Sequence, residues 1–83
     1  MSQLEEMQCF VRVVEAGSIT KAAEQMNTVK SAISKRLTDL ERRLGISLLK
    51  RTTRKQTLTD AGRSYYQHCV RILDDIYEVE NAL

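Results

Sequence analysis

The segment from Asn27 to Gly45, NTVKSAISKRLTDLERRLG, combines regularly spaced apolar residues with basic and hydroxyl side chains. The apolar residues recur every three or four positions, as on one face of a helix: Ile33, Leu37, Leu40 and Leu44. With that face turned inward, the outward residues are Ser31, Ser34, Lys35, Thr38 and Arg42. This face offers hydrogen-bond donors without a bulky apolar group, which suits the major groove of double-stranded DNA. The alternative is an ordinary solvated helix face.

Two neighbouring stretches extend this candidate surface. Lys30 stands in the first turn of the helix, close to Thr28, where the positive end of the helix dipole attracts negative groups. A recognition helix enters the groove by this end, so Lys30 could bind a guanine or a phosphate. Further on, basic side chains in a Thr-rich stretch could follow the adjoining phosphates or enter a minor groove. The predicted DNA-binding residues are Thr28, Lys30, Ser31, Ser34, Lys35, Thr38, Arg51, Arg54 and Lys55.

The charge distribution agrees with a polyanion partner for the middle of the chain alone. Residues 30–63 hold ten Lys or Arg against three Asp or Glu, a net charge of +7. Residues 1–29 sum to −2 and residues 64–83 to −3, so the whole chain carries only +2. A basic block of this kind indicates either nucleic-acid binding or a solvated basic surface.

The elements that must position these residues are mostly helices, since 83 residues include no Pro and only three Gly. Ser2 and Glu5 form a capping box that predicts a helix ending at Gly17. This helix has a second apolar stripe, which we expect to touch more than its own small core: Cys9, Val13 and Ala16. Ser18 and Thr20 can both cap the short helix that follows, which contains Ala22, and a turn then leads into the basic helix. Two helices joined in this way predict a helix-turn-helix.

Residues 46–58 change to a Thr-rich pattern that predicts a two-stranded wing with a basic tip. Thr59 and Asp60 then cap a long last helix. It carries a heptad seam that predicts a dimer interface at Tyr65, Cys69, Ile72, Ile76, Val79 and Leu83. Packing on the chain's own domain is the alternative for Tyr65 and Cys69. The predicted organisation is therefore a mainly α winged helix-turn-helix domain over residues 1–58 and a linker/dimerisation helix over residues 59–83.

Catalytic, metal-binding and membrane functions find no support in the sequence. His68 is the only His and lacks a Ser or carboxylate constellation, so we expect no active site. Cys9 and Cys69 have no metal-ligand spacing, and we expect neither a metal nor a cofactor in this domain. No apolar run approaches the roughly 20 residues that cross a membrane. Acidic residues stand where a secretion signal would carry bases, so a cytoplasmic protein is expected.

Several spaced motifs together resemble one family. They are F-V-x-V-x-E-x-G-S-I-T-x-A-A-E from Phe10 to Glu24, S-A-I-S-K-R-L-x-x-L-E-x-x-L-G from Ser31 to Gly45, then L-L-K-R-T-T-R and L-T-D-A-G. This pattern is similar to the DNA-binding domain of LysR-type transcriptional regulators and covers nearly the whole chain. The resemblance implies a winged helix-turn-helix, a linker helix that pairs two domains into a homodimer, and an interrupted palindromic operator. A tetramer in the full-length protein and an effector-binding domain after Leu83, which senses a small molecule, are further implications.

The resemblance also marks departures at the start of the basic helix. Family members usually have Ser at the position of Val29, where it caps the helix, and Gln at the position of Lys30. Val cannot cap, so either Thr28 substitutes or the first turn frays. Ser31, Ser34 and Lys35 match family positions that touch DNA. The competing function is a winged-helix module that binds proteins and uses its basic face only for solubility.

Overall fold

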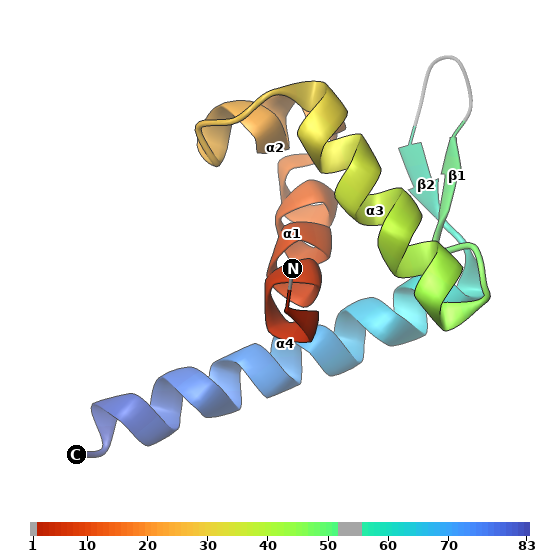
Figure 1. Cartoon of the computed structure of the whole chain (residues 1–83). Coiled ribbons are helices and arrows are strands. Elements are labelled where there is room, and N and C mark those ends of the chain that lie inside the picture. Colours follow the sequence, from red (N-terminus) through yellow and green to blue (C-terminus); the bar gives the residue numbers. More distant parts are fainter. Residues whose placement is uncertain (1, 52–55) are drawn as a thin grey trace.

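The computed structural model describes residues 2–51 and 56–83 and contains four helices with a two-stranded wing (Figure 1). The helices are α1 (Gln3–Ala16), α2 (Ile19–Gln25), α3 (Lys30–Leu44) and α4 (Asp60–Asn81). The strands β1 (Leu49–Arg51) and β2 (Gln56–Leu58) pair antiparallel, with Leu49 opposite Leu58 and Arg51 opposite Gln56. The expected mainly α winged helix-turn-helix followed by a long helix is confirmed.

The core forms around α1, which contacts each of the other three helices. Its fully buried side chains Cys9, Phe10 and Val13 meet Ile33, Leu37 and Leu40 of α3 in one cluster. From α4, the ring of Tyr65 packs on Phe10 with 5.3 Å between the ring centroids. The predicted inward stripe of α3 is therefore correct except at Leu44, which is 37% exposed because it lies in the last turn of α3.

Three helix starts have the predicted side-chain caps, and α3 does not. Ser2, Ser18 and Thr59 each accept a hydrogen bond from a backbone N–H in the first turn of α1, α2 and α4. Val29 occupies the N-cap position of α3 and makes no side-chain cap bond. Thr28 does not substitute for it. The first turn of α3 is helical nonetheless, since the Val29 carbonyl accepts from the N–H groups of both Ala32 and Ile33.

Glu41 of α3 holds the start of the wing in place. Its Oε2 accepts hydrogen bonds from the backbone N–H of Leu48 at 2.7 Å and of Leu49 at 3.2 Å. The Ser47 hydroxyl donates to the same oxygen at 3.4 Å. One carboxylate thus satisfies two backbone donors where the chain leaves α3 and enters β1.

Glu41→Gln is expected to lower the free energy of unfolding by about 1–3 kcal/mol, because hydrogen bonds to a charged acceptor become bonds to a neutral one. Urea denaturation of the variant and the wild type measures this loss. Glu24→Gln, at an exposed position of α2, serves as the matched control and should unfold at the wild-type urea concentration. Equal midpoints for Glu41→Gln and the wild type would show that the wing does not depend on this charge.

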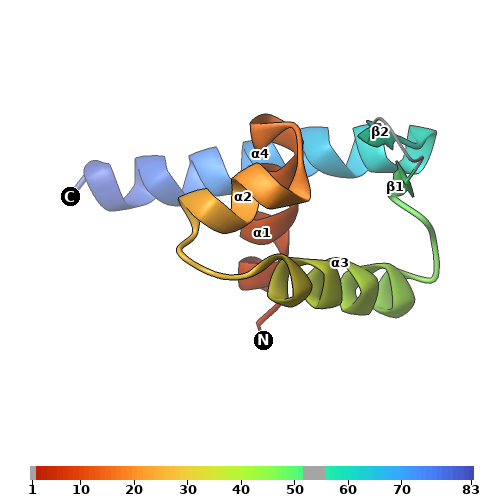
Figure 2. The same cartoon turned by 90° about the horizontal axis from the view of Figure 1, so that it is seen from above.

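The last helix divides into a half that belongs to the core and a half that projects from it. Gly62 and Cys69 are buried, and Tyr65 and Tyr66 are packed against the core cluster. From residue 74 onward every residue is exposed, and Figures 1 and 2 show this end of α4 extending away from the other elements. The boundary proposed at residues 58/59 stays a prediction, and the first turns of α4 pack as part of the winged domain.

Two expectations about apolar stripes need correction. Cys69 is 0% exposed in the single chain, so it lies in the domain core and presents no surface to a partner. Cys9 and Val13 on the second stripe of α1 are also 0% exposed, because α3 and α4 of the same chain already cover them. The free part of the predicted seam therefore begins at Ile72, which is 39% exposed.

Candidate nucleic-acid interface

The short turn between α2 and α3 sets the direction in which α3 leaves the core. Asn27 adopts a left-handed conformation with φ 54°, which Asn tolerates better than most residues. The backbone N–H of Thr28 then donates to the carbonyl of Ala23 at 2.9 Å. Thr28 itself is half-buried, while Val29 and Lys30 that follow it are exposed. The first turn of α3 thereby stands at the surface, as Figure 1 shows.

The outward face of α3 carries the hydroxyl and basic residues that the helical period predicted. Ser31, Lys35 and Thr38 are exposed and Ser34 is half-buried. The Lys35 ammonium lies 3.0 Å from Asp39, and the Arg42 guanidinium lies 3.3 Å from the other oxygen of the same carboxylate. Both cations remain exposed, with side chains 78% and 74% accessible, so the ion pairs are weak and leave the charges free to meet phosphate.

Two further bases of α3, Arg36 and Arg43, contact α1 and do not belong to this outward face. Arg43 contacts Glu6 of α1, with its Nη2 2.8 Å from Glu6 Oε1, and Glu6 is only 9% exposed. Arg36 is half-buried beside the Cys9 thiol. Burial raises the pKa of the Cys9 thiol, while the neighbouring guanidinium acts in the opposite direction. These two arginines therefore fasten α3 to α1, and the basic block is not all available to a polyanion.

The wing adds one exposed base that sequence reasoning did not select. Lys50 is exposed on β1 and pairs with Thr57 across the strands. Its signal was the alternation of the strand, since the neighbouring Leu49 is buried at 5% exposure. Arg51 ends β1 opposite Gln56. Arg54 and Lys55, which were predicted to bind DNA, lie outside the described residues.

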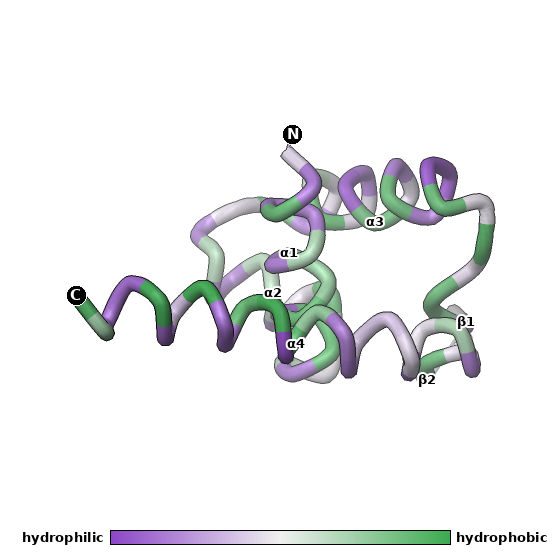
Figure 3. The backbone as a smooth tube through the Cα atoms, turned by 90° about the horizontal axis from the view of Figure 1, so that it is seen from below, coloured by the Kyte–Doolittle hydropathy of each residue, from purple (hydrophilic) through white to green (hydrophobic). Residues whose placement is uncertain are grey.

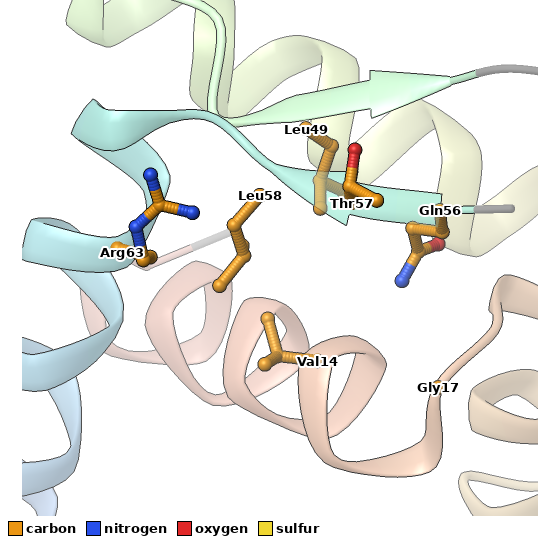
Figure 4. A pocket seen from close by; sticks show the side chains of 7 residues that line it. All are labelled: Val14, Gly17, Leu49, Gln56, Thr57, Leu58 and Arg63. Atoms are coloured by element: carbon orange, nitrogen blue, oxygen red, sulfur yellow. The ribbon is translucent and has the colours of Figure 1, made fainter.

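A pocket separates the wing from α1 and does not involve α3. It is lined by Val14, Gly17, Leu49, Gln56, Thr57, Leu58 and Arg63. Figure 4 shows Val14 of α1 and Leu58 of β2 pointing toward each other across it. Gln56 spans the gap, because its side-chain amide donates to the Val13 carbonyl at 3.5 Å. The pocket thus marks where the wing rests on α1, away from the outward face of α3.

Within residues 2–51 and 56–83 no group of three His, Cys, Asp or Glu is placed to hold a metal ion. In that part of the chain no helix is both long and apolar enough to span a membrane. Burial raises the pKa of the Cys69 thiol, which disfavours the reactive thiolate.

Comparison with known proteins assigns this arrangement to a family. The family model described as bacterial regulatory helix-turn-helix protein, lysR family, matches residues 4–63. The chain belongs to the LysR family. An HTH-type transcriptional repressor of Pseudomonas aeruginosa is 45% identical over 83 residues, which are 100% of this chain and 26% of that protein. The transcriptional activator AaeR of Escherichia coli is also 45% identical over the whole chain and 27% of its own length.

Solved structures agree with the LysR assignment. The BenM DNA-binding domain in complex with benA site 1 DNA has a TM-score of 0.93 at 32% identity, covering 98% of this chain and 91% of that one. The CbnR DNA-binding domain bound to DNA gives 0.89 at 28% identity, covering 98% and 93%. This chain spans about a quarter of the length of its curated LysR relatives.

The projecting half of α4 carries the other surface expected of a LysR linker helix. Ile72, Ile76 and Val79 are 39%, 38% and 67% exposed and line a shallow groove together with Asp75 and Glu80. Figure 3 shows hydrophobic positions alternating with hydrophilic ones along this half of the helix. Leu83 lies beyond the end of α4 and is fully exposed. An apolar row on an otherwise solvated helix is what a partner helix would cover.

Proposed function

We propose that this chain is the DNA-binding part of a homodimeric LysR-type transcriptional regulator that binds double-stranded DNA sequence-specifically through α3. The observation that carries the proposal is the outward face of α3, where exposed Ser31, Lys35 and Thr38 surround half-buried Ser34. A fold shared with DNA-bound LysR domains supports the same reading. The first turn of α3 would enter the major groove, and the wing bases Lys50, Arg51, Arg54 and Lys55 would follow the flanking backbone.

A DNA titration at several salt concentrations tests this proposal against a winged-helix module that binds only proteins. Counterion release requires the affinity to fall steeply as salt rises, and selection from random duplexes should enrich a common site. Affinity that is weak and equal for all duplexes at physiological salt would favour the protein-binding module.

The remaining parts of the proposal concern the assembly. The free seam of α4 would pair two chains, so we infer an operator with two half-sites in an interrupted palindrome. A tetramer and a small-molecule effector would depend on further domains of the kind that complete the LysR relatives. The regulator would act in the cytoplasm at the bacterial nucleoid, and this domain would need no cofactor.

Lys30→Gln is expected to move a base preference from guanine towards adenine at one position per half-site. Lys offers donors only and can bind guanine O6 and N7, whereas Gln offers the donor and acceptor that adenine requires. The expected discrimination is about 1–3 kcal/mol, measured by titrating both proteins against all four bases at each half-site position.

Lys21→Gln, at an exposed position of α2, is the control for the lost charge and should leave the base preference unchanged. If Lys30→Gln weakens all duplexes equally and makes the salt dependence shallower, Lys30 holds a phosphate and reads no base.

A further inference from the structure

Val29 is an exposed apolar residue at the tip of the recognition helix. Its exposed fraction is 64%, the largest of any apolar residue before α4 in the described residues. It directly precedes Lys30, the first residue of α3, and its backbone is extended with φ −101° and ψ 155°. The side chain therefore contributes nothing to the core, where Ile33 of the next turn is fully buried.

Val29 also makes no side-chain N-cap hydrogen bond, an interaction that the other described helices have. Ser2, Ser18 and Thr59 cap α1, α2 and α4 with side-chain oxygens, and a hydroxyl at position 29 would do the same for α3. Val29 cannot, so neither capping nor core packing in the isolated domain accounts for its isopropyl group. The neighbouring exposed side chains Lys30 and Ser31 belong to the surface that α3 presents to DNA.

We infer that Val29 is a specificity-determining residue that contacts the C5-methyl group of a thymine in the major groove. This inference rests on the proposed DNA binding by α3. Thymine is the base that displays a methyl group in that groove, and apolar side chains read it by contact. Because the tip of a recognition helix lies against base edges, an isopropyl group there meets the groove and not the solvent. We therefore predict that the protein selects one thymine in each half-site through this apolar contact, without a hydrogen bond between Val29 and the base.

Replacing single thymines by uracil tests this contact, because uracil lacks only the methyl group. The duplex is the site that the wild-type protein selects from random sequences, and each thymine is exchanged in turn. Wild type should lose about fourfold in affinity at one thymine per half-site, as expected for about one buried methyl group. Val29→Ala should bind the thymine and uracil duplexes equally at that position.

Two further variants separate base reading from folding. Val29→Ser should raise the melting temperature by adding the missing cap and should still lose the thymine preference. Ile46→Val removes a methyl group from an exposed apolar residue beyond the other end of α3 and should keep the fourfold preference for thymine over uracil. A wild-type protein that binds all uracil duplexes as well as thymine duplexes overturns the inference. A fourfold preference for thymine over uracil that remains in Val29→Ala also overturns it. Failure to select any site would instead contradict the proposed function.

Discussion

Gly62→Ala is expected to destabilise the domain by about 3 kcal/mol or more, although alanine normally stabilises a helix relative to glycine by up to about 1 kcal/mol. A Cβ at this position would lie 2.0 Å from the Leu48 carbonyl oxygen and 3.2 Å from the Leu58 side chain. The carbonyl is held where it is, because it accepts a hydrogen bond from the Thr59 N–H at 3.0 Å. Relief therefore requires α4 to move away from the wing.

Thermal and urea unfolding of Gly62→Ala and wild type measure this effect. Ser64→Ala, on the exposed side of the same helical turn, is the matched control and should be neutral or slightly stabilising. A Gly62→Ala protein as stable as Ser64→Ala would show that Gly62 of α4 and the Leu48 carbonyl, just before β1, are not in the close contact described. Because the Thr59 hydroxyl also donates to Ser47, movement of α4 would disturb the start of the wing.

Capping residues, glycines and the spacing of apolar residues predicted the helices well, because each of these features depends on a few neighbouring residues. Ser2, Ser18 and Thr59 are caps whose hydrogen bonds are made within three residues, and Gly17 and Gly45 end α1 and α3 with φ 85° and 71°. The spacing of apolar residues likewise predicted which side of α3 enters the core. For the same reason the outward residues of the candidate site, Ser31 to Thr38, could be selected before the structure was known.

Contacts between elements could not be predicted in this way. The heptad seam placed Cys69 in an interface, but the pattern repeats identically where α4 packs on α1 and where it projects. Charge counting treated Arg43 as part of the free basic surface, while its guanidinium is paired with Glu6 of α1, 37 positions earlier. No pattern in the residues around Gly62 shows that glycine is required there, because the requirement comes from the Leu48 carbonyl oxygen, which leaves no room for a Cβ. These features depend on how the helices meet in three dimensions.

Ile76→Asp is expected to convert the proposed dimer into monomers at concentrations where the wild type is dimeric. The side chain is 38% exposed in the single chain, so the substitution leaves the core of each chain intact. In the dimer it would place a carboxylate among Ile72 and Val79 of the seam, without a partner. The cost of burying such a charge is several kcal/mol, and every 1.4 kcal/mol raises the dissociation constant tenfold. A rise of at least about a hundredfold follows.

Sedimentation equilibrium over a range of concentrations measures that shift. Tyr77→Asp is the matched control, because Tyr77 is 69% exposed and lies off the heptad positions that form the seam. It should dimerise as the wild type does and melt at the same temperature as Ile76→Asp under conditions where both are monomeric. An Ile76→Asp protein with the wild-type dissociation constant would place the interface elsewhere. The monomeric variant should also bind a duplex with two half-sites no more tightly than a duplex with one. A second half-site raises the affinity only when two DNA-binding domains are joined in a dimer.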